Sequence, residues 1–496
     1  MSGRSILAYV PVNLATIVTS FGGLAILTRL LDASEYGRYA LAMITMLAFH
    51  MALFSWLEAA MARFQARAER NDDVNSHVKT LYRYALLTVA IIWPIAMAVL
   101  FVLPIDASMR NVLAVAISST CLQLFLNIGT EAHKAAHRIM RYSALYSTHL
   151  MLSFTIGIIL IIVTPLREMA LFFGIMAAII IVLSVDLPFM IKQMRGGTSD
   201  PDKVKTYFKY GMPISVSLLL TYALSSGDMY LITAMLGDAY AGEYSASYNL
   251  ANRSLDVLFI WLGMAFTPIA VTALEKQGLD QSRDVMKDYG AALLWIAMPA
   301  ATGIALVAGD VGFILGEDVR AGAVKIMPLI AFAGVLNGMI CYYAQRAFML
   351  SGKTDMFVWA MVPPVILNIG LNIVLIPKYE LMGAVYATVA AYALGLVIAM
   401  VLGRRHYPLP VPVRAFFEIS LACIAMAATV WALGPLDSLP DFIALLIKAT
   451  LGAVTYGIVC LVINAANCRD LLRDMIGRFK SKDDADIEPI TAEVTP

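Results

Sequence analysis

The stretch LYRYALLTVAIIWPIAMAVLFVL, residues 81–103, contains a single charged residue, Arg83. An apolar run of about 20 residues is long enough to cross the hydrocarbon core of a bilayer as a helix. Similar runs occur about fourteen times along the chain, and the segments between them are short. Irregular backbone in lipid would leave its polar groups without hydrogen-bond partners. The sequence therefore predicts an all-α integral membrane protein with about fourteen transmembrane helices.

Each boundary of these runs is placed to within about two to four residues. The expected spans lie at residues 6–30, 39–62, 81–103, 110–132, 142–163, 168–191, 211–236, 244–270, 288–308, 324–349, 356–376, 382–402, 415–434 and 441–463.

The composition of the 496 residues excludes several classes of protein. Hydrophobic residues make up 60% and charged residues 14%, against roughly half and a quarter in a soluble domain. A net charge of +1, from 36 Lys and Arg and 35 Asp and Glu, argues against nucleic-acid binding. The five cysteines have no short spacing, so neither a disulfide framework nor a metal site is indicated. No cofactor motif, including the Walker A pattern, is present.

Lys and Arg are distributed unevenly over the connections between the expected spans. Of the 36 positive residues, 27 fall in one alternating set of connections, seven in the other and two within spans. Because connections rich in Lys and Arg stay in the cytoplasm, this pattern predicts a multi-pass chain with cytoplasmic N- and C-termini. A missed or additional span would have broken the alternation.

Short internal similarities suggest that the chain contains two related halves. GRYA at 37–40 recurs as GEYS at 242–245, and PLREM at 165–169 recurs as PKYEL at 377–381, at nearly the same shift. Such repeats are common in transporters. We therefore expect two pseudo-symmetric six-helix lobes, with further segments after them. The expected divisions are an N-terminal lobe at 1–191, a cytoplasmic linker at 192–210, a second lobe at 211–402, two additional helices at 415–463 and a disordered cytoplasmic tail at 464–496.

Three stretches resemble the bacterial polysaccharide-transporter family, which contains the O-antigen and exopolysaccharide repeat-unit flippases. LTRLLDASEYGRYA at 27–40 is similar to the family's first outer loop. YFKYGMPISVSLLLTYALSSGDMYLI at 207–232 resembles the start of its second lobe. GKTDMFVWAMVPPVILNIGLNIVLIPKYELMGAVYATV at 352–389 resembles its most specific region. One residue departs from the family pattern, because Glu380 stands where the family usually has Gly.

The resemblance implies a fold, a location and a cargo. It implies a pair of six-helix lobes around a central cavity that opens alternately to the two sides of the bacterial plasma (inner) membrane. It also implies a lipid-linked cargo, undecaprenyl-pyrophosphate carrying a short oligosaccharide. The family belongs to a superfamily that also contains multidrug antiporters and the lipid II flippase. The polysaccharide polymerase and the export machinery are the expected protein partners.

Arg253 is the strongest candidate for binding the cargo, because an arginine within a span is costly to the bilayer. Asn249, Arg253 and Asp256 share one face of a helix by their spacing. A guanidinium carries a permanent charge and a fork that fits phosphate, so Arg253 is expected to meet the pyrophosphate. The alternative is a structural ion pair with Asp228 or Asp256, since Arg253 and Asp228 are expected at similar depths, about 14 and 12 Å.

Three further residues are candidates for coupling and recognition. Asp228 is a candidate carrier of a coupling H⁺ or Na⁺, or else a partner of Arg253, and Asp256 is a second candidate for coupling or gating. Asn13 could line a path for the sugars, although interhelical hydrogen bonds explain it equally well. Tyr230 could stack on a sugar ring, although tyrosines near helix ends usually anchor the helix at the interface.

Two other functions compete with the flippase hypothesis. A membrane polysaccharide polymerase or ligase would usually need a large outer loop, whereas the outer connections here are about a dozen residues long. An ion-coupled multidrug antiporter would share the lobes but would favour an acidic, aromatic cavity. The arginine on the expected eighth span favours an anionic cargo instead.

Overall fold

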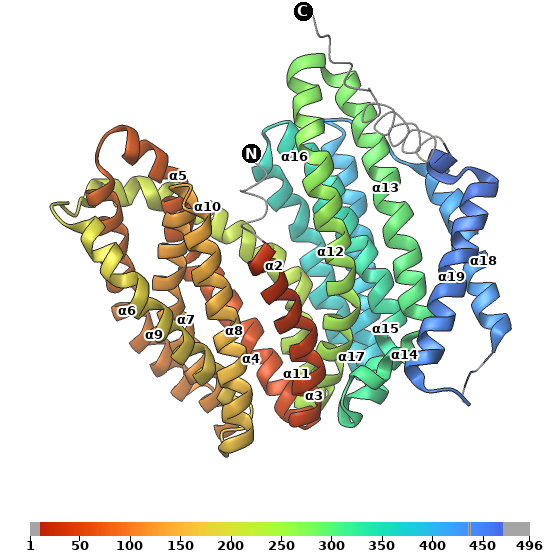
Figure 1. Cartoon of the computed structure of the whole chain (residues 1–496), viewed down its shortest axis with the longest axis horizontal. Coiled ribbons are helices and arrows are strands. Elements are labelled where there is room, and N and C mark those ends of the chain that lie inside the picture. The colour runs from red at the N-terminus through yellow and green to blue at the C-terminus, as the bar shows by residue number, and fades with distance from the viewer. Residues whose placement is uncertain (1–9, 435, 437, 470–496) are drawn as a thin grey trace, which may run out of the picture. The chain divides into compact units, whose positions relative to one another are not determined.

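The structure is a computed structural model that describes residues 10–434, 436 and 438–469 (Figure 1). All regular elements in these residues are helices, which confirms the predicted all-α fold class. The first part of the chain forms α2 (Val10–Ile17), η1 (Val18–Gly22), α3 (Gly23–Leu30), α4 (Ala33–Leu53), α5 (Ser55–Arg70), α6 (Val74–Val102), α7 (Ala107–Ala135), α8 (Ile139–Val163) and α9 (Met169–Met194).

The second part of the chain continues without strands over the same described residues. It forms α10 (Pro201–Ser226), α11 (Asp228–Leu236), α12 (Asp238–Gln277), α13 (Leu279–Leu306), α14 (Ala308–Val311), η2 (Gly312–Ile314), α15 (Glu317–Gly338), η3 (Met339–Ala344), α16 (Gln345–Leu350), α17 (Thr354–Gly403), α18 (Val413–Leu433), α19 (Asp441–Ile463) and η4 (Ala465–Asn467).

The helices long and apolar enough to cross a membrane number eleven among the described residues. They number twelve if α4 and α5, which are bent by 52° relative to each other, form one span. The expected number of about fourteen therefore stays a prediction. The differences lie in α10 with α11, which are not counted, and in α17, which counts once although its backbone is broken at Glu380.

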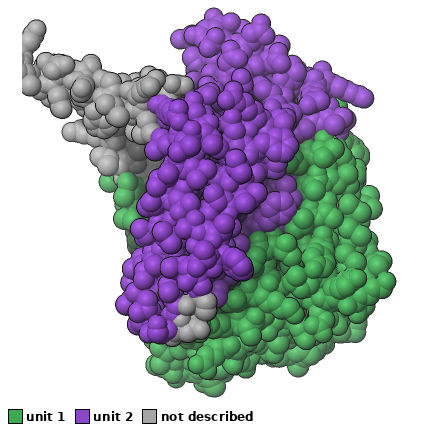
Figure 2. All heavy atoms as spheres, turned by 90° about the vertical axis from the view of Figure 1, so that its right-hand side faces the viewer, with its two compact units in different colours: residues 1–250, 312–330, 354–399 green, residues 251–311, 331–353, 400–496 purple. Residues whose placement is uncertain are grey.

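The contacts within the chain define two compact units, coloured separately in Figure 2. Unit 1 comprises residues 1–250, 312–330 and 354–399, and unit 2 comprises residues 251–311, 331–353 and 400–496. The units do not follow chain order, so the predicted lobes at 1–191 and 211–402 and the central cavity stay predictions. Most of the predicted disordered tail, from residue 470 onward, lies outside the described residues.

Small residues allow the helices of unit 1 to pack closely. A Cβ on Gly174 of α9 would lie 2.6 Å from the backbone nitrogen of Gly157 in α8. Leu126, Ile179 and Val182 form part of a buried cluster that joins α7 and α9. Because lipid is as apolar as the side chains, membrane helices associate through close packing of this kind. The glycines of α8 and α9 therefore account for their intimate contact.

The two copies of the internal similarity meet at one end of unit 1. Gly37 begins GRYA in α4, and Gly242 begins GEYS in α12. A Cβ on Gly37 would lie 1.8 Å from the Asp238 carbonyl oxygen, and a Cβ on Gly242 would lie 2.3 Å from that of Ala33. No side chain fits at either position without separating the helices. The two matching glycines thus permit direct backbone contact between the first and second halves of the sequence.

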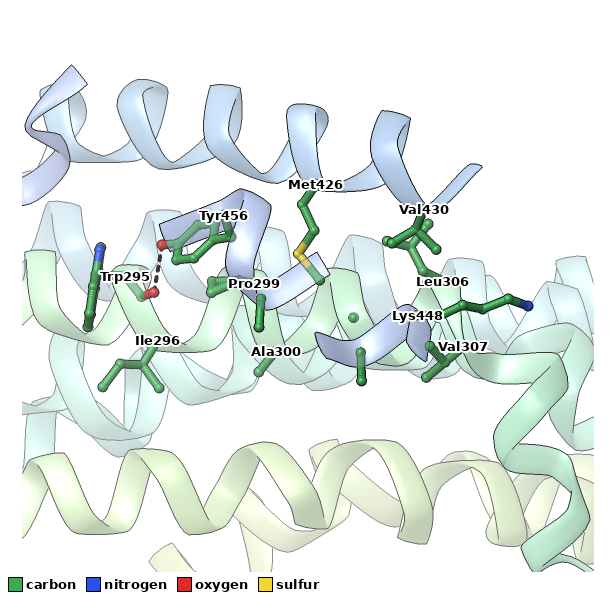
Figure 3. A pocket seen from close by; sticks show the side chains of 13 residues that line it. Trp295, Ile296, Pro299, Ala300, Leu306, Val307, Met426, Val430, Lys448 and Tyr456 are labelled. Carbon is green, nitrogen blue, oxygen red and sulfur yellow. Dashed lines mark hydrogen bonds between the residues drawn. The ribbon is translucent and has the colours of Figure 1, made fainter. Parts of the chain in front are cut away.

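Unit 2 contains the two helices expected after the lobes. Both α18 and α19 pack against α13, and the Tyr456 hydroxyl of α19 donates a hydrogen bond to the Trp295 carbonyl at 2.7 Å. Lys448 of α19 forms an ion pair with Asp310 at 2.8 Å. Figure 3 shows the largely apolar cavity of about 390 Å³ that these three helices enclose. The ion pair and the tyrosine therefore attach α19 to the rest of the unit by polar contacts.

Glu380 occupies a backbone conformation that favours glycine. Its φ of +51° and ψ of −133° interrupt α17 at the Ile-Pro-Lys-Tyr turn, where the resembling family usually has Gly. A residue with a side chain pays about 1–3 kcal/mol in such a region. Glu243 also lies close enough for like-charge repulsion with Glu380. The departure from the family pattern therefore places local backbone strain at this turn.

Glu380→Gly is expected to raise the free energy of unfolding by about 1 kcal/mol, because Gly adopts positive φ without a steric penalty. Thermal unfolding of the purified protein would measure the change. Glu275→Gly is the matched control, since Glu275 is exposed within the regular helix α12 and Gly there should cost about 1 kcal/mol. A loss of stability in Glu380→Gly would show that the Glu380 side chain contributes more than its backbone strain costs.

Candidate functional site

The candidate residues on α12 lie on one continuous helix. Arg253 is exposed, although it belongs to one of the apolar helices long enough to span a membrane. Asp256, half-buried, accepts a hydrogen bond from Asn252 at 3.0 Å and lies close enough to Arg253 for electrostatic attraction. Asn249 donates to the carbonyl and hydroxyl oxygens of Ser245, at 2.9 and 3.1 Å. The helix therefore carries an exposed guanidinium with a carboxylate one turn away.

Asp228 lies at the first residue of α11, where the helix resumes after a break at Gly227, and only 1% of it is exposed. Its Oδ2 accepts hydrogen bonds from the hydroxyl of Tyr244 in α12 and, at 3.1 Å, from the hydroxyl of Thr388 in α17. The positive end of the α11 dipole favours a carboxylate at this point. No ion pair in the described part of the chain includes Asp228, so its buried charge has no cationic side chain beside it.

Two asparagines of α17 extend the polar surroundings of Asp228. Asn368 donates to the Thr388 hydroxyl at 3.5 Å and accepts from Asn372 at 3.0 Å. Among the described residues, the buried Asn372 Oδ1 has no hydrogen-bond partner and the Asp228 Oδ1 receives no hydrogen bond from another side chain. Buried acceptors of this kind are costly unless something binds them. We refer to Asp228, Tyr244, Asn368, Asn372 and Thr388 as the Asp228 cluster.

The oxygen atoms of the Asp228 cluster suit two kinds of small cation. Hard metal cations prefer oxygen ligands from carboxylates, amides and hydroxyls, and a proton on the carboxylate would supply a donor for an acceptor oxygen. No group of three or more His, Cys, Asp or Glu in the described ranges could hold a metal ion. The cluster thus offers one carboxylate among neutral oxygen donors, which is a weak and exchangeable type of site.

Asn13 and Tyr230 are exposed, on α2 and α11 respectively. The Tyr230 hydroxyl donates a hydrogen bond to the Thr45 hydroxyl of α4 at 3.0 Å, and 40% of the residue is exposed. The hydrogen-bond partners of Tyr230, Asp228 and Asp256 are therefore different residues, and no hydrogen bond in the described part of the chain joins these three candidates to one another. Asp228 could be identified from the sequence because it is a carboxylate within an apolar run. Tyr244 and Thr388 could not, because both are ordinary helix residues.

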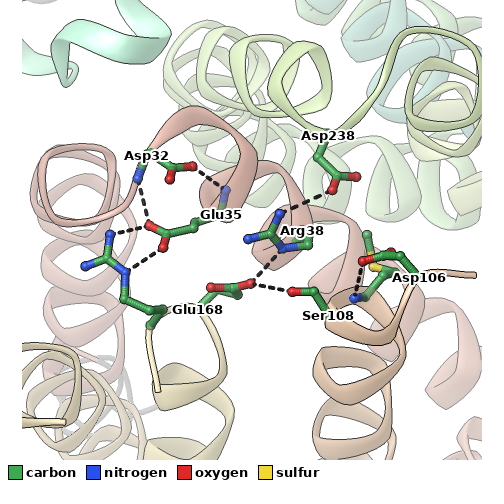
Figure 4. Close-up of polar contacts among 9 residues, drawn as sticks. Asp32, Glu35, Arg38, Asp106, Ser108, Glu168 and Asp238 are labelled. Atoms are coloured by element: carbon green, nitrogen blue, oxygen red, sulfur yellow. Dashed lines mark hydrogen bonds and ion pairs between the residues drawn. The ribbon is translucent and has the colours of Figure 1, made fainter. Parts of the chain in front are cut away.

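A second polar site, not anticipated from the sequence, lies in unit 1 where α4 and α12 begin (Figure 4). Arg38 of α4 donates to the Glu168 carboxylate at 2.7 Å and to the Asp238 carboxylate at 3.4 Å. The Arg167 guanidinium donates to both oxygens of Glu35, each at 2.5 Å. The only sequence signal was the gathering of opposite charges near the ends of the expected spans. Arg38 connects the first half of the chain to the start of α12.

The local sequence explains why Glu35 is held in place beside Arg167. Asp32 is the N-cap of α4 and accepts from the Glu35 backbone at 2.8 Å, while the Glu35 side chain accepts from the Asp32 backbone at 2.9 Å. This reciprocal arrangement is a capping box, which satisfies two backbone donors at the start of the helix. Glu35 therefore both caps α4 and pairs with Arg167.

Arg38→Ala is expected to destabilise the protein by about 1.5–3 kcal/mol, because the largely buried Glu168 would lose a charge-assisted hydrogen bond. Arg38→Lys should cost less, since Lys keeps the charge but not the fork that spans two carboxylates. Thermal unfolding would measure both. Arg63→Ala, which removes an exposed arginine of α5, is the control. Equal melting temperatures for Arg38→Ala and Arg63→Ala would contradict a stabilising role.

These features define a class of protein. Long apolar helices, an arginine exposed on one of them and a buried carboxylate among neutral oxygen donors are typical of a multi-pass membrane transporter. The chain belongs to the polysaccharide biosynthesis protein family, whose model matches residues 2–274.

A curated protein is similar to part of the chain. The sequence is 25% identical over 254 residues to a protein of Haloferax volcanii named "Probable flippase AglR". The match covers 50% of this chain and 52% of the relative, so the chain spans about half the length of the curated relative it matches.

Solved structures share the fold. The lipid II flippase MurJ in an inward closed conformation has a TM-score of 0.74 at 13% identity, over 94% of this chain and 100% of that one. An inward-facing multidrug resistance MATE family transporter of the MOP superfamily has a TM-score of 0.67 at 12% identity, over 80% and 97%. At these identities the likeness concerns the fold alone. The relatives named here, a probable flippase, a lipid II flippase and a multidrug transporter, are transport proteins rather than enzymes.

Proposed function

We propose that this protein flips undecaprenyl-pyrophosphate-linked oligosaccharide repeat units, of an O-antigen, capsule or exopolysaccharide, across the bacterial plasma (inner) membrane by alternating access. The observation that carries the proposal is the exposed guanidinium of Arg253 on α12. A fixed positive charge on a membrane helix favours an anionic headgroup over a cationic drug. The family of polysaccharide biosynthesis proteins supports the sugar as cargo.

In this proposal the polar headgroup and the lipid tail occupy different surroundings. Arg253 binds the pyrophosphate, the Asn249 Oδ1 accepts from a sugar hydroxyl, Asn13 donates to one, and the exposed ring of Tyr230 stacks on a sugar face. The polyprenyl tail remains in the lipid. The flipped unit then passes to the polysaccharide polymerase and the export machinery. The cytoplasmic location of both termini is part of the same proposal and is supported by the distribution of Lys and Arg.

We assign to the Asp228 cluster the role of coupling transport to a cation gradient. Asp256 is a second candidate for coupling or gating. A buried carboxylate without a cationic neighbour needs a proton or a metal cation to balance its charge. Na⁺ and H⁺ both fit the available oxygen atoms. A membrane potential would act on either ion, at about 2.3 kcal/mol per charge and 100 mV.

The pool of lipid-linked sugars in a strain lacking the protein tests the proposed cargo. We expect undecaprenyl-pyrophosphate oligosaccharide to accumulate on the cytoplasmic leaflet and surface polymer to fall. Oligosaccharide that reaches the outer leaflet but stays unpolymerised would favour a polymerase instead. An unchanged pool together with new sensitivity to cationic drugs would favour the multidrug antiporter of the same superfamily.

A further inference from the structure

A second cavity, of about 850 Å³, lies in unit 1 between α6, α7, α9 and the segment that joins α9 to α10. Its lining changes character along α6. Lys79, Arg83 and Leu86 are spaced to share one face of that helix, and all three line the cavity. From Lys79, Arg83 lies about 6 Å and Leu86 about 10.5 Å further along the helix. The wall therefore passes from two cations to an apolar surface within about two turns.

The opposite wall of the cavity is apolar where α9 forms it. Leu183 and Leu187 are one turn apart on α9 and both line the cavity. Leu187 is 38% exposed and Leu86 is 60% exposed. Large exposed leucines on membrane helices are compatible with lipid chains as neighbours. The apolar end of the cavity thus opens toward the lipid.

The basic end of the cavity lies at the boundary of the membrane. The apolar run of α6 begins near residue 81, and that of α9 ends near residue 191, so Lys79 and Arg83 lie at the level of the lipid headgroups. This is also the end where most connections carry Lys and Arg, the cytoplasmic end in the proposed orientation. Basic pockets between membrane helices at this level bind anionic lipid headgroups.

Neither cation is neutralised by a carboxylate among the described residues, and only Lys79 is held by a hydrogen bond. The Lys79 ammonium donates to the carbonyl oxygen of Gly197 at 2.8 Å, which leaves two of its three donors available. Arg83 is exposed and has neither an ion pair nor a hydrogen bond within the described residues. The buried hydroxyl of Ser199, which also lines the cavity, has no hydrogen-bond partner among them. Two positive charges and a free hydroxyl therefore converge on one space.

The nearby carboxylates have partners of their own and do not compensate these charges. Asp73 pairs with Lys203, and this contact lowers the pKa of the Asp73 carboxyl. Asp186 pairs with Arg141 at 2.6 Å and with His133 at 2.9 Å. Asp200 accepts from the backbone at the start of α10. An anion supplied from outside the chain is the group that the basic end lacks.

The segment between α9 and α10 forms the polar floor of the cavity and is fixed to the start of α6. Asn75 donates to the Arg195 carbonyl at 2.9 Å, and the Thr80 hydroxyl accepts from the Asp200 backbone at 3.1 Å. A Cβ on Gly197 would lie 2.4 Å from the backbone of Asn75, so only Gly allows this close approach. The floor is therefore built by specific contacts.

We propose that this cavity binds one anionic phospholipid, with its phosphate between Lys79, Arg83 and Ser199 and its acyl chains along Leu86, Leu183 and Leu187. The order of the lining, from cations to leucines, matches the order of headgroup and chains in the lipid. The site is separate from the residues proposed to bind the cargo, and a failure of lipid binding would leave the experiment on the sugar pool unaffected.

Binding of dioleoylphosphatidylglycerol to the purified full chain in detergent tests the proposal, with native mass spectrometry as the readout. We expect Lys79→Gln/Arg83→Gln to bind this lipid about thirtyfold more weakly, which corresponds to about 2 kcal/mol for two basic residues. Gln preserves most of the side-chain length and a donor for Gly197. Arg404→Gln/Arg405→Gln, which removes two exposed arginines beyond α17, should bind as the wild type does.

Several results would overturn the proposal. Equal weakening in the two double variants would indicate general attraction to a basic surface. Equal binding of dioleoylphosphatidylcholine would indicate an apolar groove without selection for anions. Displacement of dioleoylphosphatidylglycerol by an equal concentration of soluble glycerol phosphate would indicate a phosphate site in which the acyl chains have no role. Displacement of dioleoylphosphatidylglycerol by undecaprenyl phosphate at a tenfold lower concentration would indicate that the cavity is an entry site for cargo. If the double variant does not fold, Arg83→Gln alone supplies the test, because Arg83 holds no structural contact.

Discussion

Replacing Arg253 with Ala is expected to lower the export of lipid-linked oligosaccharide about tenfold to a hundredfold, at an unchanged amount of protein in the membrane. Hydrogen bonds between charged groups contribute about 1.5–3 kcal/mol each, and the proposed pyrophosphate contact would lose the guanidinium entirely. Arg253→Lys should retain part of the activity, since it preserves the charge but not the two-pronged geometry. The lipid-linked sugar pool and the surface polymer would measure both effects.

The Arg253 experiment needs a control for general effects of removing a positive charge. Arg405→Ala removes another exposed arginine and should leave export unchanged. Normal export by Arg253→Ala at a normal protein level would exclude a role in binding the cargo. Loss of the folded protein in Arg253→Ala, with full recovery in Arg253→Lys, would favour a purely structural pairing within the helix bundle.

Asp228→Asn is expected to preserve folding and to abolish the dependence of transport on a cation gradient. The amide has nearly the shape of the carboxylate, and its oxygen can still accept from Tyr244 and Thr388. It carries no charge, so it neither takes up a proton nor attracts a metal cation. One coupled charge is worth about 2.3 kcal/mol at 100 mV, so the distribution of cargo between the leaflets should change by a factor of about fifty.

Transport in proteoliposomes under an imposed Na⁺ or pH gradient would measure the effect of Asp228→Asn and identify the ion. Asp256→Asn tests the second candidate under the same conditions, and Asp284→Asn, at an exposed position of α13, is the control. Gradient-dependent transport by Asp228→Asn would exclude the Asp228 cluster as the coupling site. A loss confined to Asp256→Asn would transfer the coupling to α12.

Some of the polar residues could be predicted from the sequence, but their hydrogen-bond partners could not. Asp228 was a candidate because a carboxylate within an apolar run is unusual on its own. Its partner Tyr244 is 16 residues away and Thr388 is 160 residues away, and neither residue type is unusual in a helix. The Arg38 contacts likewise join residues 130 and 200 positions apart. Pairings over such distances depend on which helices become neighbours, and composition carries no information about that.

The sequence by itself determined the properties that depend on local composition. Apolar runs of sufficient length make helices and membrane spans, because lipid leaves the backbone no other hydrogen-bond partners. The resemblance to the polysaccharide-transporter family, which usually has Gly where Glu380 stands, pointed to a turn in which φ is positive. Only the tertiary structure decided which charges are compensated. In the sequence, Lys79 and Arg83 are ordinary basic residues at the end of a span. They became a candidate site because the folded chain provides an apolar wall beside them, and no carboxylate of the described residues neutralises them.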